Sequence, residues 1–404
     1  MTTQTSIAPE SMPYATAQPD AGSRAAPRSR IEVIDAMRGL VMVIMILDHV
    51  RETFYLHRQV TDPMDVATTE PSLFFSRLAA HFCAPMFVFL TGLGAWLYAN
   101  PASGVPRSAT GFLVKRGLLL ILLEVTLVTF AWNGKFPPPV IYLQVIWVIG
   151  LCMIILALLH RLPRGVLAAI AFALVFGHNL LTPISFAPGS AGYIPWTILH
   201  DRGFLVSDGL VKIKVSYPLL PWIGVILFGY LAGPLFGKAM DPARRAKTLT
   251  LAGAACLALL AVLRGFNIYG ETLPWVHGAD GLHTVMSFLN FTKYPPSLDF
   301  LLLTLGVGLL LMPRLEAMRN AFTRMLATFG GAPMFFYLLH LYVLLALQVL
   351  MVAIFGPNHG ERWGLDVFWP VWPISLALVP VLYFPCRTFA RFKRTTTQGW
   401  VRYF

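Results

Sequence analysis

Apolar segments of about 20 residues recur along the whole chain, separated by shorter stretches that gather charged residues and prolines. A helix of that length crosses the hydrocarbon core of a membrane and satisfies its own backbone hydrogen bonds. The pattern predicts an all-α fold, a polytopic transmembrane helix bundle of about ten helices. The predicted helices lie at residues 34–55, 74–99, 112–132, 140–159, 164–182, 217–237, 247–264, 297–313, 332–355 and 370–390.

The apolar segments form one membrane domain, residues 31–392, between two polar tails. Residues 1–30 are rich in Ala, Ser, Thr and Pro and lack an apolar core segment, so we expect a disordered cytoplasmic tail and no cleavable signal peptide. Residues 393–404 form a short basic cytoplasmic tail.

Composition agrees with a membrane protein, because 56% of the residues are hydrophobic and only 12% are charged. The charged share is about half that of an ordinary soluble domain. The cysteines lie inside apolar segments, without the spacing of a zinc site or a disulfide framework, so we expect no metal.

Lysine and arginine gather in alternate connecting segments, which predicts the orientation in the membrane. We place the cation-rich segments and both termini in the cytoplasm, with the protein as a multi-pass component of the cell (inner) membrane. The net charge of +12 follows mostly from this bias and indicates contact with anionic membrane lipid rather than a nucleic-acid partner. The expected cytoplasmic cations include Arg24, Arg28, Arg107, Lys115, Arg116, Arg161, Arg164, Arg245, Arg314, Arg319, Arg324, Lys393 and Arg394.

The first predicted helix carries most of the ionisable groups, and charge inside a membrane is usually retained for a site or a pathway. Steps of three and four residues put the following side chains on one helical face: Asp35, Arg38, Met42, Met45, His49 and Glu52. Arg38 and His49 are eleven residues apart, roughly 16 Å along the helix axis. A cation thus lies near the cytoplasmic boundary and an imidazole lies deep in the membrane.

That geometry suits a long phosphorylated donor such as acyl-coenzyme A, with its phosphates at Arg38 and its thioester near His49. Neutral His49 would act as general base, taking a proton from the acceptor and returning it to the thiol. Whether Asp48 orients His49 or faces another helix stays open. In the alternative interpretation, Arg38 reaches the interface and Asp48 and His49 form a buried pair with another helix.

Other predicted helices supply partners for such a site. His81, four residues after Arg77, is a candidate for the active-site wall or for structural hydrogen bonding. Lys115 and Arg116 mark a cytoplasmic helix end and are candidates for donor-phosphate contact.

Buried Glu124 is expected to pair with an arginine or histidine of another helix and is a candidate substrate contact. Tyr337 and His340 share a face, which makes His340 a further candidate for the active site.

Two predicted outer loops, residues 183–216 and 265–296, mix aromatic and polar side chains suited to a sugar-like acceptor. Within them we single out His283 and Lys293 as candidate substrate contacts. Both loops also fit an ordinary interfacial role, because Trp and Tyr gather at membrane surfaces.

These residues carry a resemblance to a known family. RIEVIDAMRGLVMVIMILDHVR, followed by HFCAPMFVFLTG, is similar to the start of bacterial proteins grouped with the heparan-α-glucosaminide N-acetyltransferase catalytic domain. YPLLPWIGVILFGYLAG, KYPPSLDFLLLTLG and PMFFYLLHLYV resemble later blocks of that group. The spacing of Arg38 and His49 also resembles a motif of the wider membrane acyltransferase superfamily. That resemblance implies acyl-coenzyme A binding for Arg38 and catalysis for His49.

One departure concerns the histidine. In the lysosomal enzyme the catalytic histidine lies in the lumenal region after the first helix, where His57 is the nearest candidate in this chain. His57 is therefore a second choice for the residue that handles the acyl group.

We expect an integral-membrane acyltransferase that moves an acyl group, most simply acetyl from acetyl-CoA, to a glycan or amino-sugar acceptor on the outer side. Direct transfer and an acyl-histidine intermediate both fit. The main rival is a proton-coupled secondary transporter that uses the same buried charged residues, although no inverted repeat is evident. A nonenzymatic scaffold is a third alternative, and the oligomeric state, a homo-oligomer included, is left open.

Overall fold

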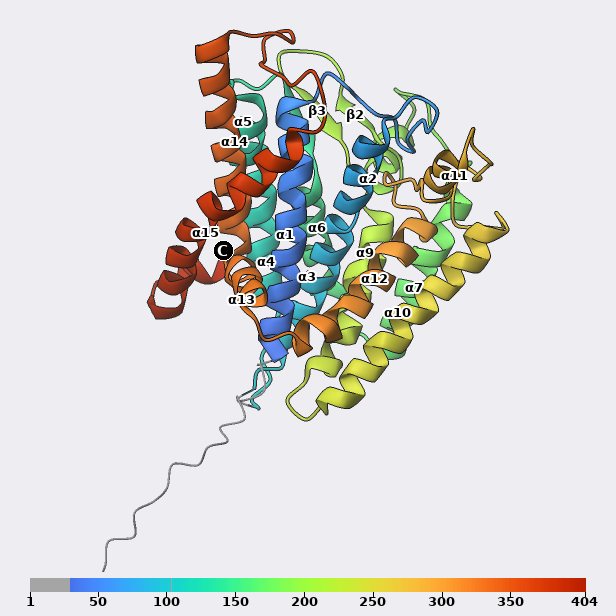
Figure 1. Ribbon diagram of the computed structural model, residues 1–404. Coiled ribbons are helices and arrows are strands. Elements are labelled where there is room, and N and C mark those ends of the chain that lie inside the picture. Colours follow the sequence, from blue (N-terminus) through green and yellow to red (C-terminus); the bar gives the residue numbers. More distant parts are fainter. Residues whose placement is uncertain (1–29, 103) are drawn as a thin grey trace, which may run out of the picture.

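A computed structural model describes residues 30–102 and 104–404, so the predicted disordered tail lies outside the described residues except for Arg30. Figure 1 shows a bundle of helices with α1 (Arg30–Phe54) at its centre and a cap of loops and short strands at one end. The helices α13 (Ala321–Gly330), α14 (Pro333–Phe355), α15 (Val371–Thr395), α12 (Leu298–Ala317) and α3 (Cys83–Ala99) all contact α1.

Each of the ten predicted segments is helical over most of its length. Besides the helices already named, the corresponding elements are α2 (Pro71–Ala80), α4 (Thr110–Leu123) continued by η1 (Glu124–Val128) and α5 (Thr129–Asn133), α6 (Val145–Leu159), α7 (Arg164–Gly177) with η2 (His178–Leu181), α9 (Leu220–Ala232) with η3 (Gly233–Phe236), and α10 (Pro242–Gly265). At the chain end, α15 runs to Thr395, and η4 (Gly399–Tyr403) follows it.

Six helices of the described part of the chain are long and apolar enough to cross a membrane by length and composition. They span Pro71–Ala99, Arg164–Leu181, Pro242–Gly265, Leu298–Ala317, Pro333–Phe355 and Val371–Thr395. The central α1 carries too many charged residues to count among them. The fold is that of a mostly helical multi-pass membrane protein, whereas ten crossings and cytoplasmic termini stay predictions.

The structure corrects the expectation of a purely helical chain. Three short strands, β1 (Val140–Leu143), β2 (Gly203–Val206) and β3 (Lys212–Val215), form a sheet in the order β1-β3-β2. β1 pairs parallel to β3, and β2 pairs antiparallel to it. The predicted helix at 140–159 therefore begins only at Val145, because apolar VIYL is hydrophobic enough for a helix but is β-branched and aromatic and follows three prolines.

Three short helices were not predicted: α8 (Tyr193–Leu199), α11 (Gly281–Phe288) and α13. The most important is α13, which packs closely along α1. A Cβ atom on Gly39 of α1 would lie 1.9 Å from the carbonyl oxygen of Leu326, and one on Gly330 would lie 1.8 Å from that of Asp35. The two backbones touch because both positions lack side chains.

We predict that Gly39→Ala loses roughly 1–3 kcal/mol of stability, since the added methyl group must push α13 away from α1. Thermal unfolding in detergent measures the change, and Gly330→Ala should behave alike. The control is Gly165→Ala in α7, where a Cβ would meet no atom within 4 Å. Equal unfolding temperatures for Gly39→Ala and Gly165→Ala would contradict the tight contact.

Candidate functional site

A cavity of about 1180 Å³ lies beside α1 and is walled by α3, α4, α6, α13, α14 and the end of α15. Its lining contains six cations against two carboxylates, Glu32 and Asp35. The cations are Arg38, Arg116, Arg319, Arg324, Lys393 and Arg394. Five of them are predicted to be cytoplasmic, and Arg38 is predicted near the cytoplasmic boundary of the first helix, so the positive charge gathers at one end of the bundle.

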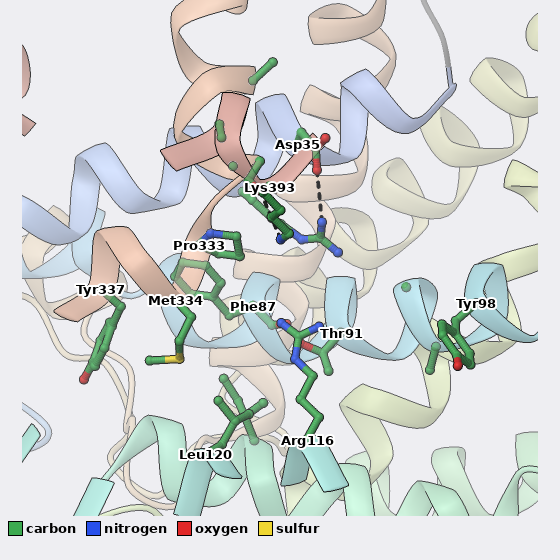
Figure 2. A pocket seen from close by; sticks show the side chains of 18 of the residues that line it. Asp35, Phe87, Thr91, Tyr98, Arg116, Leu120, Pro333, Met334, Tyr337 and Lys393 are labelled. Atoms are coloured by element: carbon green, nitrogen blue, oxygen red, sulfur yellow. Dashed lines mark hydrogen bonds and ion pairs between the residues drawn. The ribbon is translucent and has the colours of Figure 1, made fainter. Parts of the chain in front are cut away.

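Farther in, the lining becomes apolar. It includes Met45, Phe87, Leu120, Ile146, Ile149, Met153 and Met334. Figure 2 shows Tyr98 and Tyr337 toward opposite ends of the cavity, with Arg116 reaching up from α4 between them and Lys393 and Asp35 across from it. A ligand that fits this shape has a strongly anionic head and a long, less polar arm.

Arg38 is held at the cavity wall by residues on both sides. Its guanidinium donates to Asp35 Oδ1 at 3.0 Å and to the carbonyl oxygen of Leu90 at 3.4 Å. The side chains of Arg38 and Asp35 are each about one quarter exposed, so the pair stays open to the cavity. Arg38 is thus oriented by the protein and still available to an anion.

The adjacent cations Lys115 and Arg116 point in different directions. Arg116 lines the cavity, and its buried Nε has no hydrogen-bond partner in the described structure. Lys115 is exposed and is absent from the lining. The structure therefore brings one of these two predicted donor contacts to Arg38 and leaves the other outside.

His49 forms a pair with His340 of α14 next to the inner end of the cavity. His49 Nδ1 lies 2.6 Å from His340 Nε2, and the two ring planes are nearly parallel, with centroids 4.9 Å apart. His340 Nδ1 lies 2.9 Å from the carbonyl oxygen of Phe336. Tyr337, which lines the cavity, has its ring centroid 6.2 Å from that of His49, and Met45 lines it one turn earlier on α1.

Asp48 does not hold His49. Its carboxylate accepts from Arg51 Nε at 3.0 Å, and the same guanidinium donates to Glu52 at 2.9 Å. The question that the sequence left open is answered by this geometry: His340, not Asp48, is the hydrogen-bonding partner of the His49 ring.

Glu124 corrects a further expectation. Within the described residues no arginine or histidine pairs with it, and its Oε2 instead accepts from the backbone N–H of Trp147 at 2.9 Å, in the first turn of α6. The N-cap residue of α6, Gln144, makes no side-chain cap hydrogen bond. The unpaired N–H groups and the positive end of the helix dipole explain why a carboxylate is stable here.

The remaining candidates lie away from the cavity. His81 is 1% exposed, packs against Phe300, and has no hydrogen-bond partner for either ring nitrogen in the described structure. His283 is bonded through Nδ1 to Asp280 at 2.8 Å, at the start of α11.

Lys293 is 5% exposed, with its ammonium 5.3 Å from the ring centroid of Tyr294. Burial alone would lower the pKa of Lys293, but Tyr294 and Asp48 outweigh it and raise that pKa. Lys293 therefore stays a cation, and no residue of this group lines the cavity.

His57 lies in the exposed loop after α1 and stacks on His359 at 3.7 Å between ring centroids. Partial burial, helped by His359 and Arg58, lowers the pKa of His57. Neither His57 nor His49 lines the cavity itself, but the ring centroid of His49 lies 6.2 Å from that of the lining residue Tyr337, which favours His49 as the residue near a donor thioester.

Sequence reasoning missed several residues of the site. Trp132 packs edge-on against His49 at 5.1 Å between centroids, and Arg319, Arg324, Lys393 and Arg394 complete the basic mouth. The four cations were interpreted only as orientation signals. Their clustering around one cavity depends on α13 and α15, whose packing the sequence does not reveal.

The comparisons with known proteins agree with the geometry. The sequence profile described as Heparan-alpha-glucosaminide N-acetyltransferase, catalytic, matches residues 30–265. The chain belongs to this family. The predicted family is confirmed, and with it a membrane acetyltransferase as the general class. A comparison with curated proteins finds no match.

The family segment covers Arg38, His49, Arg116 and Glu124, whereas His340 and the cations of α13 and α15 lie beyond it. Within residues 30–102 and 104–404, no three His, Cys, Asp or Glu side chains are grouped so that they could hold a metal ion.

We predict that Glu124→Leu destabilises the protein by about 1–3 kcal/mol, because it leaves a buried backbone N–H of α6 unpaired. Glu124→Gln should lose less, since its amide oxygen still accepts from Trp147. Thermal unfolding of the two variants side by side measures the difference. Equal losses would show that the cap contributes nothing.

Proposed function

We propose that the protein is an integral-membrane acetyltransferase that takes its acetyl group from cytoplasmic acetyl-CoA and passes it to a glycan or amino-sugar acceptor on the outer side. The observation that carries this proposal is the cavity with a basic mouth and an apolar interior, whose lining residue Tyr337 packs against the His49–His340 pair. The acceptor class follows the family, which is named for the N-acetylation of heparan α-glucosaminide.

The cavity suits each part of coenzyme A. Its phosphates would pair with the cations of the mouth, where Arg38 and Arg116 present donors from two facing helices. The thin pantetheine arm would follow the apolar lining past Met334 toward Tyr337. The thioester would then arrive beside His49 without exposing the phosphates to the apolar part of the bundle.

The chemistry needs one base. Neutral His49 takes a proton from the acceptor hydroxyl or amine while the acceptor oxygen or nitrogen attacks the thioester carbonyl. The new C–O or C–N bond forms, the C–S bond breaks, and the proton passes from the imidazole to the leaving thiolate. No oxidant, reductant or metal enters this balance.

Acetyl-CoA and free CoA should both raise the unfolding temperature of the detergent-purified protein in a concentration-dependent way. Arg116→Ala should weaken CoA binding by about 10- to 100-fold, since a hydrogen bond to a charged group contributes roughly 1.5–3 kcal/mol. The matched control is Lys115→Ala, which removes the neighbouring exposed cation and should bind CoA like the wild type. No stabilisation at millimolar CoA would contradict the donor site and favour the transporter alternative.

His49→Ala should bind CoA normally and lose transfer of the acetyl group by at least about 100-fold, as expected for removal of a general base. The measurement is acetyl-CoA consumption by the reconstituted protein with glucosamine-containing acceptors, next to His57→Ala. Loss of turnover in His57→Ala with activity kept in His49→Ala would move the acyl-handling role to the outer loop.

A further inference from the structure

The proton positions in the histidine pair follow from one backbone carbonyl. A carbonyl oxygen can only accept a hydrogen bond, so His340 Nδ1, 2.9 Å from the oxygen of Phe336, carries a hydrogen. In a neutral imidazole the other nitrogen then has a free lone pair. His340 Nε2 is therefore an acceptor toward His49.

The tautomer of His340 in turn determines that of His49. His49 Nδ1 lies 2.6 Å from the lone pair of His340 Nε2, so His49 Nδ1 carries the hydrogen and donates it. The free lone pair of His49 then lies on Nε2. The bond thus selects one tautomer out of the two that a neutral histidine can adopt.

We infer that His340 is a positioning residue, which fixes His49 in the Nδ1–H tautomer and makes Nε2 of His49 the nitrogen that takes the acceptor's proton. This inference rests on the proposed function and adds to it the identity of the basic atom. It also determines the approach of the acceptor, whose hydroxyl or amine must meet the Nε2 edge of the ring, opposite His340.

The surroundings hold the ring in this orientation. The His340 ring is nearly parallel to that of His49, with an angle of 11° between the planes, and Trp132 and Tyr337 meet the His49 ring at 83° and 76°. When His49 gains a proton at Nε2, the positive charge is shared through its Nδ1–H bond to His340. A neutral acceptor supports that transient charge without burying a permanent negative charge between the turnovers.

The other charged groups near His49 interact with residues other than the His49 ring. The groups that act on it electrostatically are Glu52, Asp48, Lys293, Arg51 and His340. Asp48 and Glu52 are both bonded to Arg51, and Lys293 lies over Tyr294. Thr53 on the next turn donates to the backbone carbonyl of His49 and not to its ring.

The activity test compares two substitutions of His340. His340→Phe keeps a ring but removes the acceptor, and we expect kcat to fall by about 10- to 100-fold with an unchanged KM for acetyl-CoA. The acidic limb of the pH profile of kcat should move to lower pH, because the His49 imidazolium loses its partner. His340→Gln should recover part of kcat and of the pH profile, since its amide oxygen can replace Nε2.

The matched control is Tyr342→Phe, on the same helix, where the hydroxyl bonds to the carbonyl oxygen of Leu127 at 3.1 Å and lines no part of the cavity. It should have the kcat of the wild type. Wild-type kcat and pH profile in His340→Phe, or no recovery by Gln relative to Phe, would overturn the positioning role.

A second readout does not depend on turnover. Ring nitrogen-15 NMR shifts of histidine distinguish the Nδ1–H from the Nε2–H tautomer, and the signals of His49 are assigned by their loss in His49→Asn. We expect the Nδ1–H form in the wild type and its loss in His340→Phe. An Nε2–H form in the wild type would refute the inference whatever the activity, whereas failure of CoA binding with the Nδ1–H form present would refute only the proposed function.

Discussion

A helix that carries six ionisable side chains between Asp35 and Glu52 can lie at the centre of an apolar bundle only if the protein itself provides their partners. Along α1, Asp35 pairs with Arg38, and Arg51 pairs with Asp48 and Glu52. His49 pairs with His340. Ionised or polar groups without such partners would cost several kcal/mol each in hydrocarbon. Most of these partners lie on α1 itself, whereas His340 comes from α14.

Packing of α13 and α14 against α1 forms the two ends of the site. Close contact with α13 through Gly39 and Gly330 places the first turns of α1 beside the cations of α13 and α15. Deeper in the bundle, α14 supplies both Tyr337 for the cavity wall and His340 for the imidazole pair. The segment that matches the family ends at residue 265, yet the cavity needs α13, α14 and α15 to close.

Much of this architecture was predictable from hydropathy and helical periodicity. The apolar segments became helices, and Arg38 and Met45 on the predicted face of α1 line the cavity, with His49 one turn farther along. The features that the sequence did not predict depend on long-range packing. A ten-residue amphipathic helix such as α13 has no hydropathy signal of its own. The apolar sequence VIYL of β1 also fits a helix, and only its pairing with β3 shows that it is a strand. The partner of Glu124 likewise depends on which helix faces it, which one sequence does not contain.

A cryo-electron microscopy structure of the reconstituted protein with bound CoA tests the donor site most directly. We expect density for the nucleotide phosphates against Arg38 and Arg116 at the basic mouth, with the pantetheine arm leading past Met334 and Tyr337 and the thiol next to Nε2 of His49. Density for CoA at another surface, or with its thiol directed away from the histidine pair, would contradict it.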